Sequence, residues 1–524
     1  MRGLAQSTLV RGGHILVSAS GRDGATVIDD GALLVSDGRI ARVGRHEDLM
    51  DVGHAMVLGS DEHLVMPGLV NGHFHVGMTP FRLGAADRPL EQWGLQRLGR
   101  RRLDPYLDHL YGALGMIRSG TTMAQVLHYG ARGAPPLTVE AARNVIRAHE
   151  EAGLRIAYGM SVVDQNGLVG SASGGDEAFA HALPPDLAAR FRALVSAQYQ
   201  SVEEFVPKFE SMLAETESER SVRLILTPSS VERCSDRLLR EVARLSSEHD
   251  TYVHIHVQET PYQHGYAVAK WGVSPIRHLL DIGLVGPRVT CGHGVWVTDD
   301  DIEILADTGT RVCHNPSSNL RLHSGIAPLA KLLERGVSVA LGTDEQGLND
   351  DHDMFQEMRL AWTLHRLPGI GQRAPTAPEI LEMATVGGTA GTPFASEVGT
   401  LEEGMRADLI LLRMDSLTSP YVDPAIPLPD LIVRRARASD VETVMIDGRV
   451  VLRDRRHANL DIAEVEAMIR GALAGPPSPE DLELRRLAQA LEPYLIEFLA
   501  KEGDSTGSPH YRYNLRENSG GAGN

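Results

Sequence analysis

Five segments of the 524-residue chain place imidazole or carboxylate groups directly after short apolar runs. In the first of them, His73 and His75 are two residues apart, so their side chains point to the same side of an extended backbone. Neutral imidazoles with one carboxylate suit Zn²⁺ or Fe²⁺, whereas Mg²⁺ and Ca²⁺ prefer oxygen ligands. A metal with an open coordination position lowers the pKa of bound water towards about 7, which predicts hydrolytic chemistry. The segments are Asn71–His75, His254–Glu259, Cys291–His293, His314–Asn315 and Gly342–Asp344.

These segments fall within a regular alternation of strand-like and helix-like patterns. Eight strands alternating with helices predict an α/β fold of the (β/α)₈ TIM-barrel type, in which the C-terminal ends of the strands meet at one mouth. The alternative is a doubly wound sheet, but no Gly-x-Gly-x-x-Gly turn follows the first strand. The predicted strands are residues 64–73, 120–127, 154–162, 221–227, 252–257, 289–293, 310–314 and 337–343.

Hairpin signals flank the predicted barrel on both sides. Asp37-Gly38 and Asp447-Gly448 each separate two short apolar runs, as in a tight β-turn. We therefore expect a small β-sandwich domain from residues 1–63 and 398–458, with the barrel at 64–397. A helical extension at 459–502 and a flexible Gly/Ser/Asn-rich tail at 503–524 would follow.

Composition excludes several classes of partner. Lys+Arg 51 and Asp+Glu 69 give a formal charge of −18, which disfavours nucleic acid and anionic lipid. We interpret the basic stretch Arg97–Arg102 as a solvated helix face. Three scattered cysteines fit a reducing compartment, and neither a signal-peptide core nor a membrane-length apolar run occurs. The sequence predicts a soluble, cytoplasmic protein without a membrane or nucleic-acid partner.

Several motifs, in order, resemble the amidohydrolase superfamily over roughly residues 5–455, especially its cytosine deaminase, triazine hydrolase and methylthioadenosine/S-adenosylhomocysteine deaminase branch. The resemblance rests on Pro67-Gly68-Leu69-Val70-Asn71-Gly72-His73-Phe74-His75, His256-Val257-Gln258-Glu259-Thr260, Cys291-Gly292-His293, His314-Asn315-Pro316-Ser317-Ser318-Asn319 and Leu341-Gly342-Thr343-Asp344.

The resemblance implies roles for these residues. One divalent metal, Zn²⁺ or alternatively Fe²⁺, would be held by His73, His75, His256 and Asp344. Glu259 would shuttle protons to the substrate, His293 would hydrogen-bond the attacking water, and Asp344 would also accept a proton. By the same analogy, the protein would be a homo-oligomer, dimeric or larger.

Two sequence features bear on the number of metal ions in the site and on its contacts to the substrate. Binuclear members of the superfamily bridge their metals with a lysine at the end of strand four, but this chain has Thr227-Pro228-Ser229-Ser230 there. Its four lysines, at positions 208, 270, 331 and 501, lie elsewhere, which favours one metal. The adenosine-type deaminases carry a substrate-contacting histidine in this region, and Ser229 occupies its position here.

Loops after the predicted strands supply candidate contacts to a small heterocyclic substrate. Trp93 could stack on a planar ring or anchor a lid, and Arg82 could bind an anionic substituent or pair with Asp87. The loops offer Met78, Phe81, Arg82, Trp93, His128, Tyr129, Gln165, Ser229 and Glu232. Of these, we predict Arg82, Trp93, His128, Gln165 and Ser229 as the substrate-binding residues.

Three functions remain open from the sequence. The first is hydrolytic deamination of an amino-substituted N-heterocycle, which releases ammonia. A triazine-type chlorohydrolase or a cyclic amide hydrolase would use the same metal site with another leaving group. A non-catalytic barrel scaffold is disfavoured because every ligand position and both proton-handling positions are filled.

Overall fold

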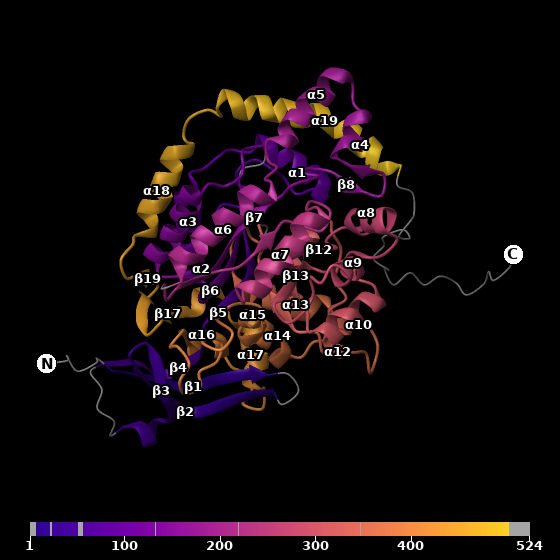
Figure 1. Ribbon diagram of the computed structural model, residues 1–524. Coiled ribbons are helices and arrows are strands. Elements are labelled where there is room, and N and C mark those ends of the chain that lie inside the picture. The colour runs from indigo at the N-terminus through magenta and orange to yellow at the C-terminus, as the bar shows by residue number, and fades with distance from the viewer. Residues whose placement is uncertain are drawn as a thin grey trace.

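A computed structural model describes residues 7–20, 24–50, 56–130, 133–217, 219–345 and 347–501. The chain forms a barrel of parallel strands surrounded by helices, with a β domain at one end and two C-terminal helices wrapped along its side and across its other end (Figure 1). The predicted tail at 503–524 lies outside the described residues.

The barrel consists of two parallel half-sheets, ordered β10-β7-β6-β5 and β12-β13-β14-β15. Parallel bridges from Leu226 to Val253 and from Phe74 to Asp344 join the halves at both seams, so the ring closes. The strands are buried, as expected for parallel strands covered by helices. They are β5 (Leu69–Phe74), β6 (Thr121–His128), β7 (Arg155–Val162), β10 (Val222–Leu224), β11 (Thr227–Pro228), β12 (Val253–Val257), β13 (Val289–His293), β14 (Arg311–His314) and β15 (Val339–Leu341).

Helices cover the barrel because their apolar residues recur on one face. In α7 (Asp236–Glu248), Leu238, Val242 and Leu245 are buried, and the Ser235 hydroxyl caps the first turn. The other helices of the barrel body are α2 (Pro105–Arg118), α3 (Val139–Ala152), α6 (Val202–Thr216), α8 (Pro261–Trp271), α9 (Pro275–Asp281), α10 (Asp299–Thr308), α11 (Pro316–Arg321), α12 (Leu329–Glu334), α13 (Met354–Leu364), α14 (Ala377–Met383) and α15 (Val386–Ala390).

The β domain is a single eight-stranded sheet, ordered β19-β18-β17-β16-β4-β1-β2-β3. It curls over its own core, since Arg39 in β3 forms a bridge with Arg406, just before β16. Residues 64–67 pair with β1 and β16, so the first barrel strand begins only at Leu69. The strands are β1 (Thr8–Ser20), β2 (Gly24–Ser36), β3 (Arg39–Arg45), β4 (Met56–Pro67), β16 (Leu409–Arg413), β17 (Val441–Ile446), β18 (Arg449–Arg453) and β19 (Arg456–His457); η2 (His46–Leu49), α16 (Met414–Thr418), α17 (Leu428–Arg435) and η4 (Ala438–Asp440) connect them.

The barrel mouth is covered by segments from three parts of the chain. The long helix α19 (Pro479–Ala500) crosses the end of the barrel opposite the β domain, near α4 (Asp176–His181) and α5 (Pro185–Ser196) (Figure 1). Apolar residues of these helices form one core with those near α1 (Leu90–Gln96). The other elements here are β8 (Gly170–Ser171), β9 (Gly174–Gly175), η3 (Arg97–Gly99) and α18 (Ile462–Leu473).

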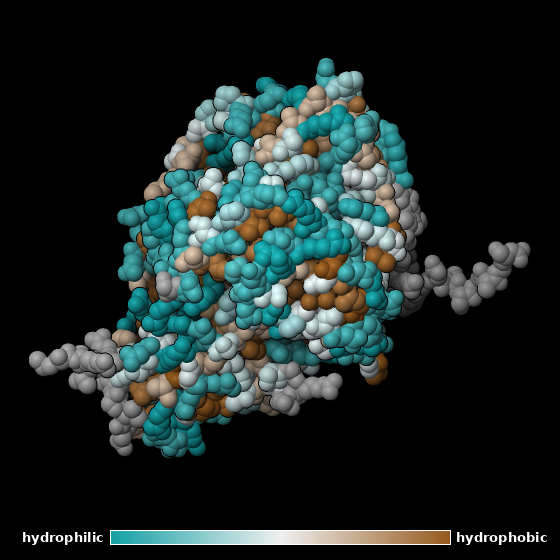
Figure 2. Space-filling model, in the orientation of Figure 1, coloured by the Kyte–Doolittle hydropathy of each residue, from teal (hydrophilic) through white to brown (hydrophobic). Residues whose placement is uncertain are grey.

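The prediction that Arg97–Arg102 forms a solvated helix face is wrong. The segment starts as the short η3 and continues extended to α2, and the Arg97 side chain is only 9% exposed. The outer face in Figure 2 is mostly hydrophilic, with small separate hydrophobic areas. Within the described ranges, none of the helices combines the length and apolarity required to cross a membrane.

Candidate active site

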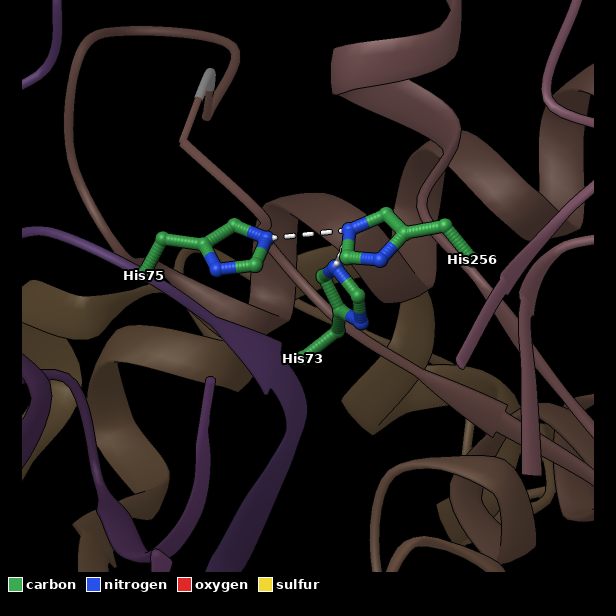
Figure 3. Close-up of side chains that lie close together, drawn as sticks. All are labelled: His73, His75 and His256. Carbon is green, nitrogen blue, oxygen red and sulfur yellow. Dashed lines mark hydrogen bonds between the residues drawn. The ribbon is translucent and has the colours of Figure 1, made fainter. Parts of the chain in front are cut away.

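Four potential metal-ligand atoms converge at the barrel mouth. The Nε2 atoms of His73 and His75 each lie 3.2 Å from Nε2 of His256, and Figure 3 shows the three rings directed towards one another. Oδ1 of Asp344 lies 3.1 Å from Nε2 of His75 and 3.6 Å from Nε2 of His73. Residues from β5, β12 and the end of β15 therefore meet at one point, although they are far apart in sequence.

The hydrogen bonds of His75 and His256 fix which ring nitrogens carry protons. Nδ1 of His75 donates to the Leu127 carbonyl at 2.6 Å, and Nδ1 of His256 donates to the Ser229 carbonyl at 2.7 Å. A carbonyl can only accept, so both Nδ1 atoms are protonated and both Nε2 atoms of the neutral rings hold a lone pair. Two facing lone pairs repel each other unless a cation lies between them.

A longer relay fixes the tautomer of His73. Nδ1 of His254 lies 3.0 Å from the Gln125 side-chain oxygen and donates to it, leaving Nε2 of His254 as an acceptor. That atom accepts the Nδ1 proton of His73 at 2.9 Å, so Nε2 of His73 also holds a lone pair. Burial lowers the pKa of His73 and His254, which keeps both rings neutral.

The spacing of these atoms fits a divalent metal ion. With ligand distances of about 2.0–2.2 Å, adjacent ligands of a four- or five-coordinate ion lie about 3–3.5 Å apart. The separations between neighbouring ligand atoms here are 3.1–3.6 Å. His73, His75, His256 and Asp344 could thus hold one ion, with three nitrogens and one oxygen.

Asp344 is oriented by a neighbour from helix α11, which follows β14. Its Oδ2 accepts a hydrogen bond from the Ser318 hydroxyl at 2.6 Å, which leaves Oδ1 facing the histidines. Burial opposes ionisation, but neighbouring polar groups, the Ser318 hydroxyl among them, hold the pKa of Asp344 below its usual value. Asp344 also has a left-handed backbone, at φ 54°, a strained conformation typical of functional sites.

Glu259 and His293 lie beside the convergence point. Nε2 of His293 is 3.7 Å from Oε2 of Glu259 and forms no hydrogen bond within the described part of the chain. On its other side, Nδ1 of His293 lies 2.9 Å from the Asn319 side-chain oxygen. Burial raises the pKa of the Glu259 carboxyl, although the charge of His293 opposes the shift. The pair can therefore hold and transfer protons next to a reacting group.

Gly342 permits the close approach of β5 to the end of β15. A Cβ at this position would lie 2.6 Å from Cβ of His73 and 2.7 Å from its backbone nitrogen. The side chain of Asn71 completes the seam, since its oxygen accepts from the backbone N–H of Thr343 at 3.1 Å. Any larger residue at 342 would displace His73.

A pocket opens above the ligand cluster and contains most of the predicted site residues. Trp93 and Ser229, two predicted substrate contacts, also line it. His73 lies beneath the pocket, fully buried. The predicted residues in the wall are His75, Trp93, Ser229, His256, Glu259, His293 and Asp344.

The side chains of the other three predicted substrate contacts do not line this pocket and form hydrogen bonds with other parts of the protein. Arg82 donates to the Tyr111 hydroxyl at 2.9 Å, outside the pocket wall, and the Arg82–Asp87 alternative is wrong because Asp87 pairs with Arg321. Gln165 donates to the backbone carbonyls of Glu232 and Cys234, which ties two loops together. His128 is buried against the Tyr158 hydroxyl at 2.7 Å and lines a neighbouring cavity.

Sequence reasoning missed several residues of the pocket wall. Arg97 is ion-paired with Glu345 at 2.7 Å and stacks on the Trp93 ring at 4.6 Å. The Tyr129 hydroxyl lies 3.1 Å from the Ser229 hydroxyl. Tyr129 was among the loop candidates because it follows the second predicted strand, whereas the only local signal for Glu345 was that it follows Asp344. The lining residues that the sequence did not suggest are Leu90, Arg97, Gly130, Val163, Gly167, Gln198, Ser230, Arg233, Gln263, Leu322 and Glu345.

The lysines lie away from the site, as the sequence predicted. Lys208 donates to the Leu137 carbonyl, Lys270 contacts Tyr266, and Lys331 pairs with Asp299. Ser229 and Ser230, which directly follow β11, occupy the end of the fourth barrel strand, where binuclear members have the bridging lysine.

Comparison with known proteins agrees with the geometry. The family model described as "Amidohydrolase family" matches residues 64–451. A 5'-deoxyadenosine deaminase of Methanothermobacter thermautotrophicus is 33% identical over 455 residues, covering 86% of this chain and 94% of that protein. A 5-methylthioadenosine/S-adenosylhomocysteine deaminase of Syntrophobacter fumaroxidans is 31% identical and covers 89% and 97% of the two chains.

Solved structures share the fold. A zinc-bound adenosine deaminase from Xanthomonas campestris superposes with a TM-score of 0.74 at 25% identity, covering 89% of this chain and 98% of that one. A zinc complex of atrazine chlorohydrolase from Arthrobacter aurescens has a TM-score of 0.74 at 22% identity, covering 89% and 99%. These neighbours confirm the predicted barrel architecture. The family model spans well over half of the sequence, so the chain belongs to the amidohydrolase family and is a hydrolase acting on carbon–nitrogen bonds.

Proposed function

We propose that this chain is a mononuclear metal-dependent deaminase, which hydrolyses an amino-substituted N-heterocycle and releases ammonia. The observation that carries the proposal is the convergence of three histidine lone pairs and one carboxylate beneath a pocket that also contains Glu259 and His293. The names of the two relatives, both deaminases of adenine nucleosides, support the same reaction class.

His73, His75, His256 and Asp344 would hold the metal, which we assign as Zn²⁺ rather than Fe²⁺. Zinc favours nitrogen-rich sites of low coordination number, and the deaminase neighbour from Xanthomonas campestris is a zinc complex. When bound, such an ion makes a coordinated water nucleophilic at neutral pH. We expect a single ion because no lysine that could bridge two metals lies at the end of the fourth barrel strand.

The protein's own groups would move the protons. Glu259, buried and near the pocket, would donate its proton to the ring nitrogen, take up the second proton of the attacking water and pass it to the departing amino group. Nε2 of His293 would hydrogen-bond the attacking water, and Oδ1 of Asp344 would take up its first proton. The proton that Asp344 takes up would then return to Glu259 before the next turnover. Trp93 would stack on the heterocycle, and the hydroxyls of Ser229 and Tyr129 would contact its edge.

Ammonia release tests the proposal. Metal-loaded enzyme would be incubated with adenosine, 5'-deoxyadenosine, 5-methylthioadenosine, S-adenosylhomocysteine, guanine, pterin and amino-triazines, with Asp344→Asn as the inactive control. We expect at least one compound to release ammonia and to yield a product that has lost one amino group. Chloride release from a chlorotriazine, or opening of a hydantoin or lactam, without any ammonia would contradict deamination and favour the alternative hydrolases.

We also propose that the enzyme is a cytoplasmic homo-oligomer that acts on small molecules alone. Its formal charge of −18 and three buried free cysteines support a reducing compartment without a nucleic-acid partner. Light scattering coupled to gel filtration would measure the assembly. A monomer at micromolar concentration would contradict the oligomer.

A further inference from the structure

A second cavity adjoins the pocket over the ligand cluster. The two share His75, Arg97 and Tyr129 as lining residues, so a molecule seated over the histidines could extend a substituent past Tyr129. The wall of the second cavity is strongly basic. Four guanidinium groups and one carboxylate line it: Arg97, Arg100, Arg101, Arg102 and Asp108.

The fold fixes this arginine segment in place. η3 is held under α19, since Arg485 donates to the Gly99 carbonyl at 2.9 Å and a Cβ on Gly99 would lie 2.7 Å from Cα of Arg485. The backbone N–H of Arg101 donates to the Leu83 carbonyl at 2.8 Å. The segment is therefore held in a fixed position by the surrounding fold and is not a loose surface loop.

The four arginines differ in how their charge is compensated. Arg97 is paired with Glu345 at 2.7 Å, and Arg102 with Glu480 at 3.2 Å and Asp481 at 3.4 Å. Neither Arg100 nor Arg101 forms an ion pair or a side-chain hydrogen bond within the described ranges, and Nη1 of Arg100 is shielded from solvent. Two arginines in one wall thus lack a hydrogen-bonded acidic partner, although the charges of Glu345 and Asp108 act on Arg100 at longer range.

The other polar groups of the cavity compensate this positive charge only in part, because Asp108 is ionised at neutral pH but forms no ion pair with Arg100 or Arg101 within the described ranges. Asp108 accepts a hydrogen bond from the backbone N–H of Met78 at 2.7 Å, and burial raises its pKa to about 6. His128 is neutral because burial lowers its pKa to about 3. A buried guanidinium N–H without an acceptor is costly, and a carboxylate or phosphate would satisfy it through two parallel hydrogen bonds.

We propose that this cavity binds an anionic substituent, a carboxylate or a phosphate, of the substrate whose heterocycle lies over the ligand cluster, with Arg100 as the main contact and Arg101 as the second. The inference rests on the proposed function, because it places the heterocycle at the metal site. It adds to that function that the substrate is an anion, in contrast to the acidic character of the chain as a whole.

The test compares matched neutral and anionic compounds on metal-loaded enzyme: pterin with pterin-6-carboxylate, and adenosine with adenosine 5'-monophosphate. In Arg100→Gln, we expect KM of the anionic compound to rise about 10- to 100-fold, the range typical of a lost hydrogen bond to a charged group. Its kcat, and both constants for the neutral compound, should stay within about twofold. Arg100→Lys, which keeps the charge but not the planar fork, should recover part of the loss.

Arg102→Gln is the matched control, since it removes the same charge from the same wall but from an arginine that already has two acidic partners. We expect less than about a threefold rise in KM for the anionic compound. An equal loss in Arg100→Gln and Arg102→Gln would indicate a general field effect and would overturn the site.

Inorganic phosphate separates a substrate substituent from a free anion. If phosphate binds the wild type but not Arg100→Gln, while anionic and neutral compounds respond equally to the substitution, the cavity holds a free anion and the proposal fails. Calorimetric binding of the same compound pairs requires no turnover. Absence of ammonia from every compound would overturn the proposed function alone. The ratio of the calorimetric affinities for the anionic and neutral compounds, compared between wild type and Arg100→Gln, would still decide this inference.

Discussion

At the scale of single residues, the site depends on groups that orient the proposed ligands as much as on the ligands. The Leu127 and Ser229 carbonyls turn His75 and His256 so that their lone pairs face the pocket. Ser318 does the same for Asp344. Such supporting groups set ligand geometry and commonly change metal affinity or activity by about 10- to 100-fold when removed.

Substitutions at Asp344 and Ser318 should separate metal binding by the carboxylate from the orientation of that carboxylate. Asp344→Asn removes the one anionic ligand, so we expect the metal content to fall well below one ion per chain and turnover to drop by about 10³-fold or more. Ser318→Ala should keep the metal and lose about 10- to 100-fold in turnover. Elemental analysis and ammonia release measure both effects. Normal turnover by metal-loaded Asp344→Asn would refute its assignment as ligand and base.

Glu259 should affect the rate without affecting the metal. Glu259→Gln keeps the shape of the side chain but cannot release a proton, so we expect kcat to fall about 10²- to 10⁴-fold with an unchanged metal content. Gln263, whose side-chain oxygen accepts from the Glu259 backbone at 2.7 Å, offers a control. Gln263→Glu should preserve that acceptor and most of the rate. If Glu259→Gln turned over normally, the proton-transfer role would have to be abandoned.

At the scale of elements, the sequence predicted the barrel strands well because their apolar runs and flanking turns are local features. It misplaced the first strand, since residues 64–67 pair with β1 and β16, which lie far away in sequence. Arg97 was interpreted as solvated because no local pattern reveals that Glu345 lies opposite it. Arg82 and Gln165 were predicted from their loops, but their orientation depends on Tyr111 and on the loop after β11.

The seam between β5 and β15 gives a prediction about elements. Gly342→Ala would place a methyl group 2.6 Å from Cβ of His73, so the strands must separate. We expect a loss of about 1–3 kcal/mol in the free energy of unfolding, together with reduced metal content. Gly115→Ala in α2 is the control, because nothing lies within 4 Å of its added methyl group. That variant should gain about 0.5–1 kcal/mol. Equal stability of the two variants, measured by urea unfolding, would contradict the tight seam.

At the scale of the whole molecule, one buried ion pair joins the barrel to the β domain. Arg155 in β7 donates through Nε and Nη2 to both carboxylate oxygens of Asp408, at 2.9 and 3.0 Å, and both side chains are 1% exposed. Asp408 also accepts from the backbone N–H of Asp447 at 2.8 Å, in the turn between β17 and β18. The pair fixes the relative position of the two parts, so it should influence the cooperativity of unfolding.

Arg155→Met should cost about 3–5 kcal/mol in the free energy of unfolding, because it leaves the Asp408 carboxylate buried without a countercharge. The double variant Arg155→Met/Asp408→Leu removes that charge as well, so it should cost clearly less than the sum of the two single variants. Arg143→Met is the matched surface control: Arg143 pairs with Glu215 at 2.6 Å with both side chains partly exposed, and its loss should cost under about 1 kcal/mol. Urea unfolding followed by circular dichroism gives all four values. Additive costs in the double variant would mean that the two charges do not depend on each other, and the ion pair could then not be what holds the β domain against the barrel.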